Sequence, residues 1–152
     1  TIIMATSLTP ATLTITHTES ILLGGSDRGS THTQTVASVA EYTNRIVNIG
    51  TAETDIVGFG AANGQGTYVR TDVKYMRFSN LDDTNYITIG VSKTGADTAY
   101  FKLEAGQTFI VNNDELEIDA SGGASSAFVE ADNISAKANG AGVDIEFAIA
   151  LT

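Results

Sequence analysis

Apolar and polar residues alternate along much of the chain, most clearly in its last ten residues. Five apolar residues stand at every second position there, separated by acidic residues and alanine: Val143, Ile145, Phe147, Ile149 and Leu151. Side chains along a β-strand point alternately to the two faces of a sheet, so this period of two places all five on one face. The pattern predicts a strand over 142–151 whose other face begins acidic and ends in alanine.

Several shorter segments show the same character. The stretches 73–78, 86–91, 98–103 and 108–111 are rich in β-branched and aromatic residues and are separated by turn-forming Asn, Asp, Ser and Gly. Strands of about five to seven residues with a turn every 8–12 are typical of a sandwich or barrel. The region 73–116 is therefore predicted to be a meander.

The first half of the chain is less regular. Residues 12–18 alternate, and 45–49 and 55–59 resemble strands. The compositions of 24–30, 58–66 and 121–126 predict loops. Residues 31–43 are ambiguous, because the spacing of their apolar residues fits one helical turn whereas their Thr, Val and Tyr content favours a strand.

Length and composition indicate one all-β domain. The chain has 152 residues and 15.9 kDa, contains one proline, Pro10, and has no cysteine. We expect a single-domain antiparallel β-sandwich of jelly-roll type over 11–152, preceded by an extended segment over 1–10; a closed β-barrel is the alternative. Met4 resembles a translation start, so Thr1–Ile3 would come from an upstream start or an addition; alternatively, the chain is a mature product cut before Thr1.

Charge and hydropathy argue against two classes of partner. Acidic residues number 18 and basic residues 8, and the net charge is −10. Nucleic acids and anionic membranes are bound by clustered Lys and Arg, so neither partner is expected. We also expect neither a signal peptide nor a bilayer-spanning segment, which would need an apolar run of about 18 residues.

Candidate chemical sites have simpler structural interpretations. The oxygen-rich turns 82–85 and 112–115 could bind Ca²⁺, but they lack EF-hand spacing, and such residues are common in ordinary turns. His17 and His32 have no His or Cys nearby in sequence, so no transition-metal site is predicted. Asp144 and Glu146 share a strand face and are expected to be solvated or at a subunit contact. No catalytic residue, metal or cofactor is predicted, and the chain is not expected to be an enzyme.

One stretch carries a resemblance to a known group of proteins. Residues 75–90 read YMRFSNLDDTNYITIG, and 100–109 read YFKLEAGQTF. This succession of strand, N-L-D-x-T-N turn, strand and L-x-A-G-Q turn resembles small β-sandwich virion proteins of tailed bacteriophages, over about 35 residues. The resemblance implies a head-decoration (cement) protein or a tail accessory, β-rich and often trimeric, and carries over no catalytic residue.

The leading functional interpretation is therefore a non-enzymatic virion protein that decorates a phage capsid or tail. Its partners would be its own copies, with a trimer favoured, and the major capsid protein or another virion protein. One alternative is a subunit of an extracellular β-rich filament, in which the N-terminal strand completes a neighbour's sheet. Another is a carbohydrate- or calcium-dependent binding module. The residues expected at interfaces are Ile2, Ile3, Leu8, Tyr86, Tyr100, Ala148 and Ala150.

Overall fold

A computed structural model describes residues 8–95, 98–112 and 131–152. The strands are β1 (Ala11–Glu19), β2 (Leu22–Leu23), β3 (Ser26–Asp27), β4 (Ser30–Val39), β5 (Glu41–Ile49), β6 (Thr54–Gly60), β7 (Thr67–Val69), β8 (Val73–Asn80), β9 (Ile87–Ser92), β10 (Thr98–Leu103), β11 (Thr108–Val111), β12 (Asn133–Ala138) and β13 (Val143–Leu151). A single turn of 3₁₀-helix, η1 (Arg70–Asp72), precedes β8.

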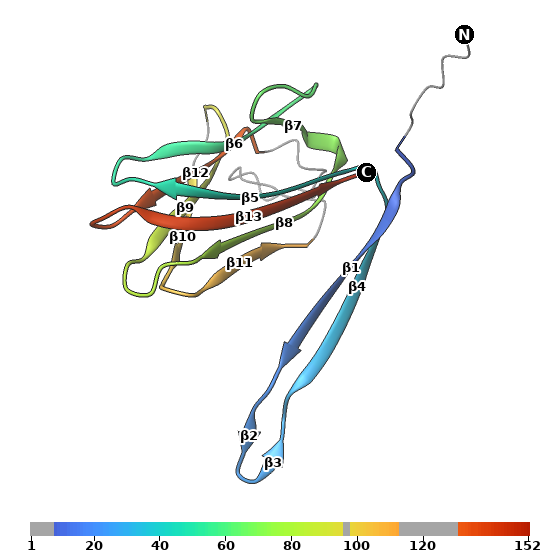
Figure 1. Ribbon diagram of the computed structural model, residues 1–152, viewed down its shortest axis with the longest axis vertical. Helices are drawn as coiled ribbons and strands as arrows, with labels where there is room; N and C mark the ends of the chain where they lie inside the picture. Colours follow the sequence, from blue (N-terminus) through green and yellow to red (C-terminus); the bar gives the residue numbers. More distant parts are fainter. Residues whose placement is uncertain (1–7, 96–97, 113–130) are drawn as a thin grey trace.

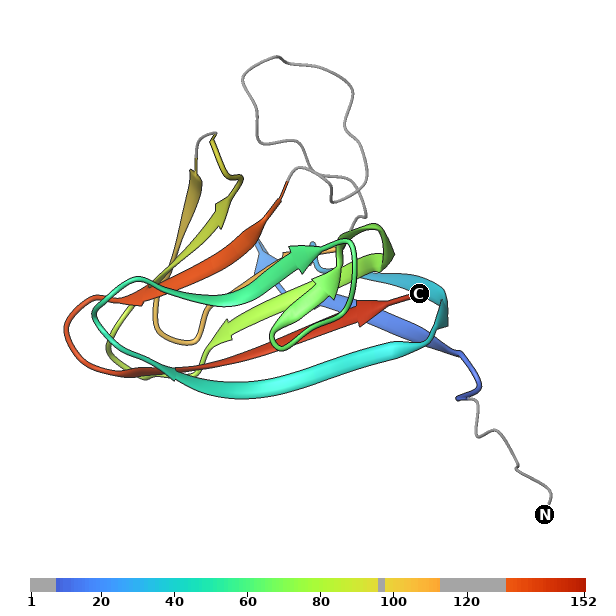
Figure 2. The same ribbon diagram turned by 90° about the horizontal axis from the view of Figure 1, so that it is seen from above.

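Two sheets face each other and form a sandwich (Figures 1 and 2). Their strand orders are β10-β9-β12-β6-β7 and β11-β8-β13-β5. Without the short β7, eight strands run from β5 to the end of the chain. The first of them, β5, pairs with the last, β13; moving inward along the chain, β6 pairs with β12, β8 with β11 and β9 with β10. All four pairings are antiparallel. This nesting is the jelly-roll arrangement, so the predicted fold is confirmed, and the separate sheets exclude the barrel.

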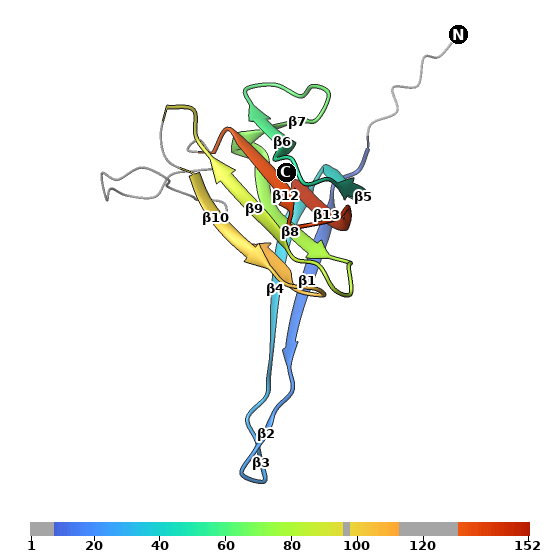
Figure 3. The ribbon, with the colours of Figure 1, turned by 90° about the vertical axis from the view of Figure 1, so that its left-hand side faces the viewer.

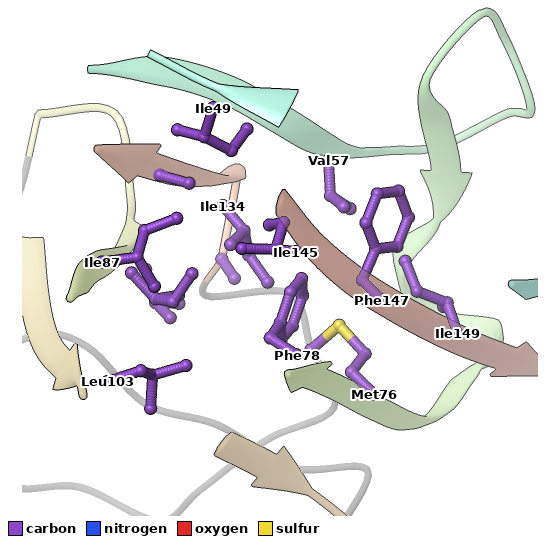
Figure 4. Packing of buried hydrophobic residues seen from close by; sticks show 14 of the residues in the cluster. Ile49, Val57, Met76, Phe78, Ile87, Leu103, Ile134, Ile145, Phe147 and Ile149 are labelled. Carbon is purple, nitrogen blue, oxygen red and sulfur yellow. The ribbon is translucent and has the colours of Figure 1, made fainter. Parts of the chain in front are cut away.

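The core lies between the two sheets. All five alternating apolar residues of the last strand are buried, at 2% exposure or less. Phe147 stacks on Phe78 of the neighbouring strand, with ring centroids 6.0 Å apart. The opposite sheet contributes Ile87 and Ile134 (Figure 4) together with Ile89, each fully buried. A period of two in the sequence has therefore become one continuous apolar layer.

The sequence analysis missed the strand β12. It pairs with both β6 and β9 in the middle of its sheet, and its inward residues are Ile134, Ala136 and Ala138. Two of these three are alanines, so its apolar signal was weak. The ambiguous segment 31–43 proves to be strand, in β4 and the start of β5. The predicted loop 121–126 lies outside the described residues, whereas the loop 58–66 begins later than expected because β6 continues to Gly60.

A partly exposed ion pair holds Asp132, the residue that precedes β12, against Arg70. Asp132 accepts hydrogen bonds from Arg70 Nη2 at 2.9 Å and from the backbone N–H of Thr94 at 2.6 Å. Arg70 Nη2 also donates to the carbonyl oxygen of Phe59, at 2.9 Å. The Thr94 bond, reinforced by Arg70, lowers the pKa of Asp132 below its usual range.

Strands β1 and β4 form an antiparallel ribbon that projects from the sandwich and ends in the β2-β3 hairpin; we call this ribbon with its hairpin the arm (Figures 1 and 3). Its base packs on the outer face of the β11-β8-β13-β5 sheet, where Ile15 and Val36 contact Tyr75 and Ala150. This burial raises the pKa of the Tyr75 hydroxyl. The arm thus has one anchored end and one end extending away from the body.

A β-bulge lies where the arm meets the body. Ala11 pairs with Val39 and Leu13 with Val36, so β4 contains one residue more than β1 across this interval. Ser38, within the bulge, has φ of 58°, the left-handed conformation that glycine adopts more easily. Bulges bend a strand and increase its twist, so this one helps to set the direction of the arm.

Candidate interaction surfaces

The tip of the arm displays three consecutive large apolar residues. Ile21, Leu22 and Leu23 are 51%, 74% and 65% exposed. They precede a two-residue turn, Gly24–Gly25, in which both glycines have positive φ, as a type I′ hairpin turn requires. A tight turn of this kind leaves no loop to fold back over the apolar side chains. Exposed apolar patches of this sort commonly mark an interaction site.

The shaft of the arm has two different faces. Cross-strand register pairs Thr14 with Thr35, Thr16 with Thr33 and Thr18 with Thr31 on one face. The alternate face pairs, from base to tip, Leu13 with Val36, Ile15 with Gln34, His17 with His32 and Glu19 with Ser30. The apolar residues Leu13, Val36 and Ile15 therefore occupy the anchored end of this second face, and polar pairs continue it outward.

A shallow apolar hollow lies beside the base of the arm. It has a volume of about 180 Å³ and is lined by Ala11, Thr12, Leu13, Val39 and Tyr42. Tyr42 belongs to β5, so the hollow joins the arm to the body. It adjoins the apolar cluster under the arm, to which Leu13 and Val39 also contribute.

The strand β5 is a long, open sheet edge. It spans nine residues and pairs with β13 along its whole length. Among the described residues, no strand pairs with its other side. Tyr42 and Ile46, on the outer face of β5, are both more than half exposed. Such an edge presents unpaired backbone N–H and C=O groups that can accept another strand.

The outer face of the same sheet is polar beyond the arm. Arg77 forms an ion pair with Glu146 and donates to Ser79 Oγ at 2.6 Å. The Glu146 hydrogen bond raises the pKa of Arg77. Asp144 accepts from Asn48 Nδ2 at 2.8 Å. Asp144 and Glu146, the predicted acidic face of the last strand, thus each have a partner within the same sheet.

Tyr100 lies across the outer face of the opposite sheet. Its register partner is Gly90 on β9, and its hydroxyl reaches Glu53 Oε1 at 3.4 Å. Glu53 also accepts from Ser135 Oγ, at 2.7 Å. A Cβ atom added to Gly90 would lie 2.6 Å from Ser135 Oγ and 3.0 Å from Tyr100 Cε1. Gly90 therefore makes room for a tyrosine that remains more than half exposed.

The predicted interface residues fall in different environments. Ile2 and Ile3 lie outside the described residues, and Leu8 is 77% exposed. Tyr86 is half-buried, with Lys102 Nζ 4.1 Å from its ring centroid.

Ala148 and Ala150 are fully buried. The expectation that these alanines admit a neighbouring subunit stays a prediction for Ala148, whereas at Ala150 the chain's own arm already packs against the side chain. Small side chains there allow that close approach.

The sequence analysis did not identify the tip residues or the exposed side chains of β5. A usable signal existed at the tip, where three large apolar residues directly precede two glycines. At β5, Tyr42 and Ile46 resembled ordinary strand residues, and only the strand order reveals that they lie on an edge.

In the first oxygen-rich turn, 82–85, the Asp82 carboxylate accepts hydrogen bonds from backbone N–H groups of the same turn. Asp82 Oδ1 accepts hydrogen bonds from the N–H groups of Thr84 and Asn85, at 2.8 and 2.6 Å. These two hydrogen bonds lower the pKa of Asp82, and the bond from Asn85 has the larger effect. This is the ordinary geometry of an Asx turn. Of the second turn only Asn112 is described. Within the described ranges, no three His, Cys, Asp or Glu residues converge to hold a metal ion.

Comparisons with known proteins find little. No protein-family profile and no curated protein sequence matches the chain. One solved structure, described as "Bacillus endospore appendages form a novel family of disulfide-linked pili", superimposes with a TM-score of 0.45 and 9% identity over 98% of this chain and 96% of that one. The present sequence contains no cysteine. No helix within the described residues is long and apolar enough to cross a membrane.

Proposed function

We propose that this chain is a non-enzymatic structural subunit that assembles with its own copies into an extracellular filament. The observation that carries the proposal is the arm with its apolar tip. Isolated two-stranded ribbons are at best marginally stable in water, and three exposed apolar residues at the end of one add a further cost. A surface of this kind is expected to be covered in the functional state.

The chain itself offers a partner for the tip. The arm extends away from the body, so its tip does not reach the apolar hollow of its own base (Figures 1 and 3). From Leu13 to Leu22 an extended strand covers about 30 Å. The hollow of a second copy, lined by Leu13, Val39 and Tyr42, has matching apolar character. The tip of one subunit is therefore proposed to insert into the hollow of the next.

The geometry of this contact favours a polymer. Tip and hollow are different surfaces, so the contact is heterologous and leaves a free tip and a free hollow at the ends of any chain of subunits. Heterologous contacts form open filaments unless the rotation between subunits closes a ring. The free edge of β5 provides a second contact, to which residues 1–10 of a neighbouring copy would add by strand addition.

A capsid-decorating role is a second candidate. The observation favouring it is the eight-strand jelly roll, an architecture that viral capsid domains use, although the same fold also serves lectins and cupins. A decoration protein would form closed oligomers that bind a phage shell, whereas a filament subunit would form open polymers.

Electron microscopy of the purified protein tests the proposal. Filaments of uniform width would support it. Closed rings of defined size would favour the decorating role. Monodisperse single subunits at every concentration examined would contradict both.

A further inference from the structure

The two histidines of the chain lie directly opposite each other on the arm. His17 on β1 pairs in register with His32 on β4, although 14 residues separate them along the chain. Directly opposed side chains of an antiparallel pair project from the same face, with Cβ atoms about 4.5–5.5 Å apart. The two histidines of this 152-residue chain therefore lie side by side on one face of the arm.

The neighbouring groups leave this pair accessible. His17 is half-buried and His32 is exposed. On the side of the tip, Ser30 Oγ donates to Glu19 Oε2 at 3.4 Å. On the side of the base, Gln34 Nε2 donates to the carbonyl oxygen of Asn112 at 2.7 Å. These flanking polar side chains have partners other than the imidazoles.

We propose that His17 and His32 together bind a divalent transition-metal ion of the Zn²⁺ or Ni²⁺ type. Neutral imidazole is a preferred ligand of these ions, whereas Ca²⁺ and Mg²⁺ prefer oxygen. With Zn–N distances of about 2.0–2.1 Å, the two ligating nitrogens of a tetrahedral site stand only a few ångströms apart, a separation that opposed side chains can reach. The remaining coordination positions are open to water.

The arm prepares this site before the ion arrives. Hydrogen-bonded register holds the two strands together, so once one imidazole has bound, the second is already at a high effective concentration. An ion bound by both histidines would also cross-link β1 to β4 in the part of the arm beyond its packed base. The inference depends on the register of the arm and is independent of what the protein assembles into.

Titration calorimetry of the untagged full-length chain with Zn²⁺ and with Ni²⁺ tests the proposal. The wild type is compared with His17→Gln, His32→Gln and the double variant, and Mg²⁺ serves as the control ion. The double variant also measures background binding by surface carboxylates. We expect each single substitution to weaken the specific site by about tenfold or more, because it removes the second ligand of a chelate.

Two independent imidazoles would behave differently. Each single substitution would then remove half of the sites and leave the affinity of the other unchanged, and this result would overturn the proposal. An unchanged isotherm in the double variant would also overturn it. Metal-free melting curves of all four proteins should coincide, which separates loss of a ligand from loss of fold. Imidazole NMR signals of His17 and His32 should shift together with one binding curve.

Discussion

The apolar tip of the arm provides the sharpest test of the assembly proposal. We consider the double substitution of Leu22 and Leu23 by serine. Full burial of a leucine side chain contributes about 1.5–3 kcal/mol. Scaled by their exposures of 74% and 65%, the two leucines would contribute about 2–4 kcal/mol to a contact that buries them completely. At about 1.4 kcal/mol per factor of ten, this weakens each subunit contact by about 30- to 1,000-fold.

Sedimentation velocity over a concentration series measures this effect. The double variant should remain unassembled at concentrations where the wild type polymerises. Its melting temperature should stay close to that of the wild type, because neither leucine belongs to the buried clusters of the body. The matched control is Leu81→Ser, which removes a half-exposed leucine from the body and should leave assembly intact.

Two results would show that the tip does not drive assembly. If the double variant assembles as readily as the wild type, the tip does not form the contact. If Leu81→Ser impairs assembly equally, the loss reflects general surface hydrophobicity and not the arm.

Other substitutions test the fold beneath these surfaces. Gly90→Ala would drive a methyl group against Ser135 and should lower the free energy of unfolding by about 1–3 kcal/mol, whereas Gly140→Ala, which meets open space, should change it little; chemical denaturation compares the two. Asp132 has a lowered pKa in the folded state, so the stability it contributes is present above its unfolded pKa and is lost as the pH falls through the folded value. Asp132→Asn should therefore be less stable at pH 7 and lose less stability below about pH 4, as melting temperatures across that range would show. Ser38→Gly relieves a left-handed φ of 58° and should stabilise the protein by up to about 1 kcal/mol in the same denaturation assay; destabilisation would contradict the strain assigned to the bulge.

The sandwich was predictable because its strands have one buried face. In β13 strict alternation of large apolar residues encodes the core face directly, and the strands β8–β11 are separated by turns of recognisable composition. The predicted meander over 73–116 is wrong, however, because β9 and β10 lie in one sheet and β8 and β11 in the other, a pairing that turn composition does not encode. The strand β12 escaped prediction because alanines, Ala136 and Ala138, fill two of its three inward positions and give little apolar contrast in the sequence.

The arm was less predictable, for a different physical reason. Most of its residues are exposed on both faces, so no buried side imposes a pattern on the sequence. The pairing of His17 with His32 depends on the register of two strands joined through a distant turn. The contact of Ala150 with the arm depends on where the arm packs on the sheet, and the alternating pattern of β13 does not predict that tertiary contact.

Light scattering on a sizing column most directly tests whether this chain associates with its own copies. A filament subunit should give an absolute mass well above the 15.9 kDa of one chain, rising with protein concentration as subunits add to an open polymer. A constant mass of 15.9 kDa across the whole concentration range would show that the chain does not assemble with its own copies.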